Sequence, residues 1–173
     1  MIQLTYEPAL DPFHTVYRLL RLRPIIAKYG PLHRDHVRIL DYYHLFPYRI
    51  DSIRLTPQHR KYRKLASHYQ ATAPYGEHPE DRVLFNRMEP MQIAALDTLA
   101  SQNLIDPERW KLGEVLATAD PIPSALAPRI EAANERDEEL EGFLGILASE
   151  YPLQGTNGLK DRTGLMEHRH DAV

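Results

Sequence analysis

Six basic side chains between positions 49 and 64 form the arrangement in this sequence that best suits a binding chemistry. They are Arg49, Arg54, Arg60, Lys61, Arg63 and Lys64. Cations so grouped can neutralise the backbone phosphates of a nucleic acid without reading its bases. The same side chains could instead meet an acidic surface of a partner protein, or form only a solvated helix face. Tyr62, Leu65, Ala66 and Tyr69 predict the buried stripe of the helix that carries the last four cations, which are therefore expected in water.

Histidine and carboxylate side chains do not combine into a metal site with a full set of ligands. His33 and His36 could share one face of a helix with Asp35 between them, but the sequence identifies no third ligand from elsewhere. His168 and His170, near the end of the chain, are weaker candidates still. We therefore predict no metal site and no cofactor.

Motifs for catalysis are also missing. The sequence has no phosphate-binding GxxxxGK[ST] loop and no GxSxG nucleophile elbow, and without cysteine it has no thiol nucleophile. Asp106, Glu108 and Lys111 come nearest to the carboxylate and lysine set of a nuclease, but Pro107 between them predicts a turn. We predict that the chain is not an enzyme.

Length and composition describe an ordinary globular domain. The chain has 173 residues, of which 43% are hydrophobic and 26% charged, values that exclude a wholly disordered protein. No apolar run approaches the ~20 residues that a membrane-spanning helix needs. The absence of cysteine excludes disulfides and fits a cytoplasmic protein. We therefore expect the protein in the cytoplasm and expect no membrane partner.

Charge is divided unevenly along the chain. Residues 1–73 hold 12 lysines and arginines against 5 acidic residues, a net charge of +7, whereas residues 74–173 carry a net charge of −10. Such a division suggests a basic face for a polyanion or an acidic partner. Alternatively, the two halves fold together and neutralise one another. The sequence leaves both readings open.

Helical spacing of apolar residues dominates, so the expected fold class is mainly α, a helical bundle with short strands. Phe13, Val16, Tyr17 and Leu20 predict one core stripe, in a helix that starts at Asp11-Pro12 and is kinked or ended by Pro24. Further helices are predicted over residues 36–45, from residue 57, and over 80–88, 89–103 and 128–150. Residues 48–55 are expected to be irregular or a short strand.

These elements are expected to form a single helical domain over residues 1–152, basic over 1–73 and acidic over 74–152. The helix, turn and short extended pieces of residues 80–118 have the shape of the end of a winged helix, although a plain helix–loop–helix fits nearly as well. Residues 71–79 are expected to be a flexible connection, and the polar residues 153–173 a flexible tail.

Two segments carry a resemblance to a known family. Tyr6–Leu20 and Ile39–Pro47 resemble the opening and the second helix of the middle-component proteins of bacterial ABC-three-component systems. That family includes accessory subunits of Lamassu-type anti-phage and anti-plasmid defence systems. The likeness extends to about residue 55 and continues only in the order of helices.

The resemblance implies a small non-catalytic subunit with protein partners. Family members are encoded beside an ATPase with SMC-like heads and beside an effector that is often a nuclease. By analogy, the chain would bridge the ATPase heads to the effector and would meet double-stranded DNA through the complex. The family offers no catalytic residue to carry over.

The alternative is a free-standing winged-helix transcription regulator. It predicts a homodimer that binds specific DNA half-sites one helical turn apart. The predicted recognition helix at 89–103 contains Glu89 and Asp97 and no lysine or arginine. This alternative therefore ranks below the accessory subunit, and an enzyme of unrecognised type ranks third.

Overall fold

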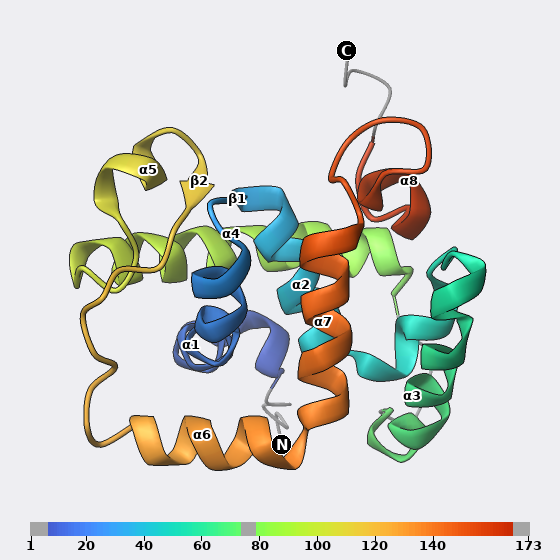
Figure 1. Ribbon diagram of the computed structural model, residues 1–173, viewed down its shortest axis with the longest axis horizontal. Helices are drawn as coiled ribbons and strands as arrows, with labels where there is room; N and C mark the ends of the chain where they lie inside the picture. The colour runs from blue at the N-terminus through green and yellow to red at the C-terminus, as the bar shows by residue number, and fades with distance from the viewer. Residues whose placement is uncertain (1–6, 74–78, 168–173) are drawn as a thin grey trace, which may run out of the picture.

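The computed structural model describes residues 7–73 and 79–167, which form a mainly helical bundle with two short strands (Figure 1). The predicted fold class is thereby confirmed. The longer elements are α1 (Pro12–Tyr29), β1 (Leu32–His33), α2 (Arg34–Leu45), α3 (Arg63–His68), α4 (Asp81–Ser101), α5 (Pro107–Lys111), β2 (Glu114–Val115), α6 (Ala127–Arg136), α7 (Glu138–Glu150) and α8 (Leu159–Thr163). Four short 3-10 helices accompany them within the described residues: η1 (Pro8–Leu10), η2 (Pro47–Ser52), η3 (Pro57–Tyr62) and η4 (Gln70–Thr72).

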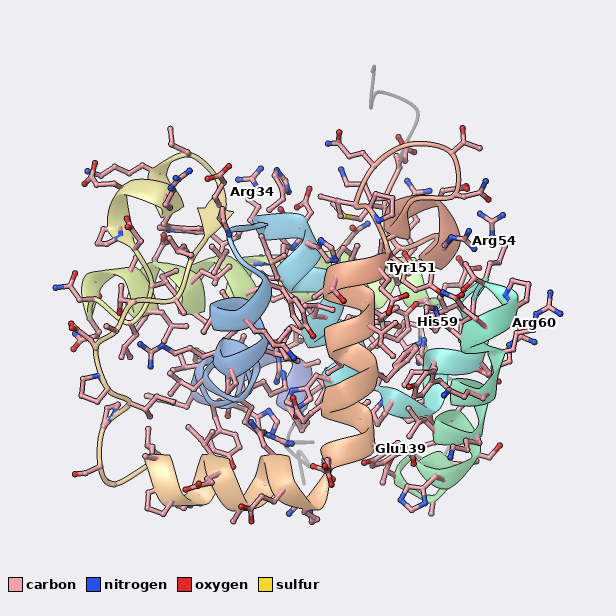
Figure 2. All side chains as sticks on the ribbon, viewed as in Figure 1. Arg34, Arg54, His59, Arg60, Glu139 and Tyr151 are labelled. Carbon is pink, nitrogen blue, oxygen red and sulfur yellow. The ribbon has the colours of Figure 1, made fainter. Side chains whose placement is uncertain are left out.

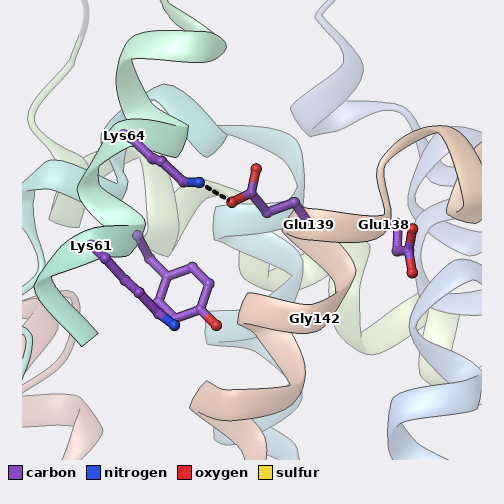
Figure 3. A pocket seen from close by; sticks show the side chains of 6 residues that line it. Lys61, Lys64, Glu138, Glu139 and Gly142 are labelled. Atoms are coloured by element: carbon purple, nitrogen blue, oxygen red, sulfur yellow. Dashed lines mark ion pairs between the residues drawn. The ribbon is translucent and has the colours of Figure 1, made fainter. Parts of the chain in front are cut away.

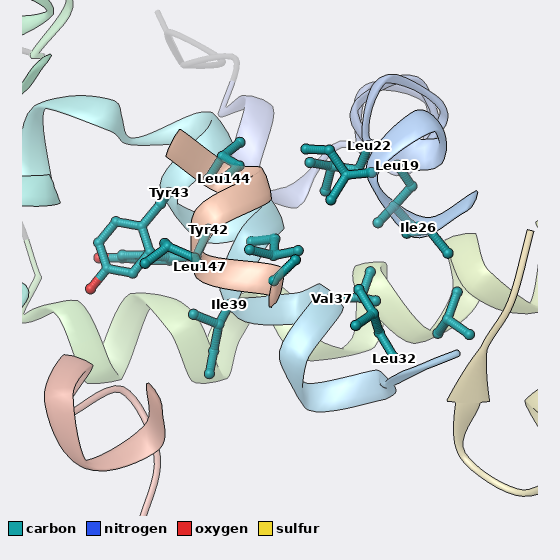
Figure 4. Close-up of a cluster of buried hydrophobic side chains, with 14 of the residues drawn as sticks. Leu19, Leu22, Ile26, Leu32, Val37, Ile39, Tyr42, Tyr43, Leu144 and Leu147 are labelled. Carbon is teal, nitrogen blue, oxygen red and sulfur yellow. The ribbon is translucent and has the colours of Figure 1, made fainter. Parts of the chain in front are cut away.

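The central helix is α2, in which every residue from Asp35 to His44 is buried. It packs against α1, α4 and α7, so that residues far apart in sequence share one core (Figure 1). Figure 4 shows this core, to which α1 contributes Leu19, Leu22 and Ile26, α2 contributes Tyr42 and Tyr43, and α7 contributes Leu144 and Leu147. Phe46-Pro47 ends α2 as predicted, and of the irregular segment or short strand expected over 48–55 the strand is absent, since residues 47–52 form η2.

Helix α1 begins where the sequence predicts, because the Asp11 carboxylate accepts the His14 amide hydrogen at 2.8 Å. Pro24 was predicted to kink or to end this helix, and it does not end it, since α1 continues to Tyr29. Pro24 lies on the exposed side, and the buried residues Leu22, Ile25 and Ile26 hold the helix on both sides of it. Tertiary packing thus outweighs the local penalty of the proline.

The stripe predicted for the core of α1 is borne out except at its first residue, since Leu20 is buried and Val16 and Tyr17 pack half-buried against the core. Phe13 is 85% exposed, and with Val16, Tyr17 and Leu20 it lines a surface hollow of about 360 Å³. The buried face of α1 also contains Thr15, Arg18, Leu19, Leu22, Ile25 and Ile26. Arg18 lies on this inner face, and because it is charged, a hydropathy pattern does not assign the face to the core.

A buried polar network explains why Arg18 can lie inside. Its guanidinium donates to both carboxylate oxygens of Asp41, at 2.7 and 3.0 Å, and Gln92 donates to the same carboxylate at 2.9 Å. Gln92 in turn accepts from Arg38 at 3.0 Å. All four side chains are buried, so the network joins α1, α2 and α4 by charge and hydrogen bonds as well as by packing.

Helix α4 is continuous where two helices were predicted. It runs from Asp81 to Ser101 through Pro90, which is exposed. Phe85, Met88, Ala95 and Leu96 are buried on both sides of that proline and hold the axis together. As at Pro24, packing outweighs the local sequence signal.

The two strands do not belong to one local hairpin. Strand β2 pairs antiparallel with β1, with Leu32 opposite Val115, and an isolated antiparallel bridge joins Ile105 to Ala117. The extended segment after α5 is therefore tied to the connection between α1 and α2. The short sheet depends on residues outside 80–118.

Residues 153–167 pack onto the bundle and are not the loose tail that their polarity suggested. Leu159 and Leu165 are fully buried, and Lys160 lies 3.5 Å from Asp35 of α2. Three well-spaced glycines obscured these two core leucines in the sequence. The rest of the predicted tail, residues 168–173, and residues 74–78 of the predicted connection lie outside the described residues.

Candidate functional site

Four of the six predicted cations lie together in water. Arg60 and Lys61 belong to η3, Arg63 and Lys64 to the start of α3, and all four are exposed. We call these four residues the basic surface. The opposite side of the same segment buries Leu65 and Ala66, which is the orientation expected from the sequence.

The other two predicted cations already have acidic partners. Arg49 is only 11% exposed and forms an ion pair with Asp81. Arg54 lies on the same edge of the molecule as Arg60 (Figure 2), but its guanidinium pairs with Asp161 at 2.8 Å. The structure therefore removes Arg49 from the predicted group, whereas Arg54 is 59% exposed and lies beside the basic surface in an exposed ion pair, like Lys64 with Glu139.

His59 holds this segment against the bundle. Its ring is buried, and its Nδ1 atom lies 2.9 Å from the Tyr151 hydroxyl, which also accepts the Thr56 amide hydrogen at 3.1 Å (Figure 2). Its Nε2 atom lies 3.3 Å from Glu150. Next to basic residues, His59 looks in the sequence like part of a charged face, yet it serves as an anchor for η3.

A hollow of about 370 Å³ separates the basic surface from α7. Its lining comprises Lys61, Tyr62, Lys64, Glu138, Glu139 and Gly142. Figure 3 shows Lys64 of α3 and Glu139 of α7 turned toward each other, with their charged atoms 2.6 Å apart. The Tyr62 ring packs 5.1 Å from the Phe143 ring, and Lys61 lies 5.1 Å from the Tyr62 ring. The hollow thus combines an aromatic wall with charges of both signs.

Ion pairs between the two halves of the chain account for much of the uneven charge. Arg21 of α1 binds Asp137 at 2.9 Å and Glu141 at 3.0 Å, and further pairs join Arg49 to Asp81, Arg54 to Asp161 and Lys64 to Glu139. Neutralisation within the fold, the second of the two readings, is therefore present. Arg60, Lys61 and Arg63 have no ion-pair partner among residues 7–73 and 79–167.

The acidic start of α7 is tuned by its neighbours. Burial raises the pKa of Asp137, but hydrogen bonds from Arg136 and Arg21 outweigh this and hold the pKa below its usual range. Tyr69 donates to the same carboxylate at 3.2 Å, and burial together with this negative charge raises the pKa of Tyr69 to about 12. Asp137 thus stays ionised and links α3, α1 and α7.

The weaker metal and catalytic candidates have structural roles. His33 caps α2 by accepting the Asp35 amide hydrogen at 3.1 Å, and His36 contacts the Leu147 carbonyl at 2.9 Å. Asp106 caps α5 by accepting the amide hydrogens of Glu108 and Arg109. Across the described ranges, no group of three or more histidine, aspartate or glutamate residues could hold a metal ion. His168 and His170 lie outside those ranges.

These features define a small helical protein that presents a charged surface and a charged hollow suited to binding. The sequence matches the family described as ABC-three component (ABC-3C) system Middle Component 5 over residues 4–171, and the chain belongs to that family. It is therefore one component of a multi-subunit system, and other components of that system are its protein partners.

The other comparisons add no relative. No curated protein and no solved structure matches the chain. Among the helices of the described residues, none is both long and apolar enough to cross a membrane.

Proposed function

We propose that the chain is a non-catalytic accessory subunit of a bacterial anti-phage and anti-plasmid defence complex of the Lamassu type. In this role it bridges SMC-like ATPase heads and an effector, a nuclease in the form we favour, and meets double-stranded DNA through the complex. Family membership supports the accessory role. The observation that carries the proposal is the basic surface, whose four cations are all exposed, in a part of the chain where the described residues hold no group able to bind a metal ion.

The order of elements supports a winged-helix hypothesis that covers more of the chain than residues 80–118. The order α1, β1, α2, α4, the Ile105–Ala117 bridge and β2 follows that of a winged helix, and residues 46–80 are inserted between its second and third helices. In this arrangement α4 would be the recognition helix. It includes Arg82 and Arg87, which the predicted helix at 89–103 lacked.

The contacts at the start of α4 favour an accessory subunit over a free-standing regulator. Asp81 is paired with Arg49, and Arg82 lies 2.6 Å from Glu167. A helix whose first turn is bound by η2 and by the segment after α8 is poorly placed to enter a major groove. The winged-helix arrangement is more useful here as a scaffold for protein contacts.

Co-expression with the other components from the same operon tests the proposal. We expect this chain to co-elute with an ATPase subunit and an effector in size exclusion with light scattering. The Arg60→Glu/Lys64→Glu double variant should fold normally, because both side chains are exposed, but should weaken assembly or DNA capture. If the chain does not bind these proteins, elutes as a homodimer and binds duplex DNA, it is the transcription regulator instead.

A further inference from the structure

The floor of the charged hollow contains a glycine that the fold itself does not require. Gly142 is exposed in the interior of α7, and a Cβ atom built on it would have no neighbour within 4 Å. Glycine in the interior of a helix is less stable than alanine. Gly145, one turn later, differs, because a Cβ atom there would lie 3.4 Å from the Tyr29 ring. Tyr29 therefore packs closely over Gly145, whereas no atom of residues 7–73 and 79–167, other than the adjoining backbone of α7 and the two chain neighbours, lies within 4 Å of a Cβ atom at Gly142.

Gly142 leaves the backbone of α7 uncovered at the point where the hollow is charged on both sides. Lys61 and Lys64 approach from η3 and α3, and Glu138 and Glu139 belong to α7 (Figure 3). A missing side chain allows another polypeptide to come close to a helix. The hollow volume of about 370 Å³ is enough for a few side chains of such a partner.

The ion pair across the hollow does not close it firmly. Lys64 and Glu139 lie 2.6 Å apart, but their side chains are 65% and 53% exposed. Exposed pairs of this kind contribute little to stability, because water and salt screen them. A partner carboxylate can replace Glu139 beside Lys64 while a partner cation takes Glu139.

We propose that this hollow is the docking site for a segment of a partner protein that carries charges of both signs. Its acidic side chain meets Lys61 and Lys64, its basic side chain meets Glu138 and Glu139, and its backbone passes over α7 at Gly142. The inference rests on the proposed function, since the partner is another component of the same system. It adds the place of contact and the chemistry of the segment.

The arrangement of charge favours a protein segment over nucleic acid. A phosphate backbone carries one sign of charge and would meet Glu138 and Glu139 beside the lysines. Of the cations that could extend a phosphate track beyond the hollow, Arg49 is largely buried in its pair with Asp81, and Arg60 and Arg63 lie outside the lining of the hollow. A mixed-charge polypeptide complements both rims of the hollow.

Gly142→Gln gives a direct test, because glutamine fills the hollow and is a better helix former than glycine. The matched control is Ala27→Gln, which places the same side chain on the exposed face of α1. Each variant is co-expressed with the other components of the system, and affinity for those purified components is measured alongside binding to a short duplex DNA. Circular dichroism and thermal unfolding check the fold.

We expect Gly142→Gln to weaken binding to the partner components by about tenfold or more, and Ala27→Gln to leave it unchanged. Lys61→Glu, which reverses one exposed charge without filling the hollow, should also weaken it. Partner binding by both Gly142→Gln and Lys61→Glu at the wild-type level would overturn the docking site and leave the proposed function standing. A loss confined to duplex DNA would assign the surface to nucleic acid instead. Failure of the wild-type chain to assemble would overturn the proposed function itself.

Discussion

Removing the charge of Asp41 should destabilise the protein more than most single substitutions that leave its size unchanged. Asp41 is fully buried, and it receives two hydrogen bonds from Arg18, which is 3% exposed, and one from Gln92. Asp41→Asn keeps the volume of the side chain but leaves the guanidinium without an anion. Breaking a buried pair in this way costs about 3–5 kcal/mol, because one uncompensated charge remains inside.

The measurement is urea and thermal unfolding of the wild type and Asp41→Asn at neutral pH. For a chain of this length, about 3–5 kcal/mol corresponds to a lowering of the midpoint temperature on the order of 10 °C. Glu108→Gln is the control, because it breaks an ion pair with Lys111 whose members are 79% and 68% exposed. Such an exposed pair contributes at most about 1 kcal/mol, so this variant should unfold close to the wild type.

The double variant Arg18→Met/Asp41→Asn separates the pair itself from the cost of leaving a charge alone. With both charges absent, the loss should be clearly smaller than the sum of the two single losses. A loss below about 1 kcal/mol for Asp41→Asn, or strict additivity in the double variant, would show that water reaches this network and that it does not hold α1 to α2.

Three further predictions concern pH and helix stability. Burial is the main cause that lowers the pKa of His36 below 6.5, so the stability that the neutral ring contributes should be lost as the pH falls through its pKa in the folded protein. NMR titration of His36 checks this, and a pKa at or above 6.5 would contradict it. The pKa of Tyr69 is raised to about 12, so the stability linked to its protonated form should be lost between pH 10 and pH 12. The difference between the ultraviolet titrations of the wild type and of Tyr69→Phe should show a phenol that ionises in that upper range. A phenol that ionises near pH 10 would refute the contact with Asp137. Gly142→Ala should stabilise α7 by about 0.5–1 kcal/mol in chemical unfolding, since its Cβ meets no neighbour; a loss of stability would mean that α7 needs the glycine itself.

The start of α1 was predicted correctly because it depends on neighbouring residues, whereas no helix starts at residue 89 and the helix predicted over 128–150 is two helices, α6 and α7. Asp11-Pro12 supplies a capping carboxylate and a proline in the first turn, and both act within one turn of helix. Leu140, Phe143, Leu144 and Leu147 have the spacing of one helical stripe, which is also a local pattern, and all four are buried in α7.

Features that depend on distant partners escaped the sequence. Arg18 is buried only because Asp41, 23 positions later, neutralises it, and a hydropathy pattern assigns such a residue to water. The predicted core face of α1 was therefore centred too near Phe13, which is exposed, although Leu20 of the same stripe is buried. The continuity of α4 through Pro90 likewise depends on packing against α1 that no local signal reports.

The candidate site shows the same division between local and distant causes. The exposure of Arg60, Lys61, Arg63 and Lys64 follows from helical spacing, whereas the partners of Arg49 and Arg54 lie 32 and 107 residues away along the chain. A basic run in a sequence is thus an upper limit on the charge that remains for a ligand. Only the folded chain shows how many of these cations form ion pairs with its own acidic half.

That difference can be measured through the salt dependence of any DNA affinity at this surface. Each phosphate neutralised contributes about −0.9 to the slope of log K against log salt. The three cations without an ion-pair partner in the described structure, Arg60, Lys61 and Arg63, give a slope of about −3, whereas all six predicted cations would give about −5. The shallower slope would mean that the pairs of Arg49 and Arg54 stay closed and that phosphate contact here is weak, which leaves protein docking as the main use of the surface. The steeper slope would require those pairs and Lys64–Glu139 to open on DNA, and would contradict the assignment of this surface to a protein partner.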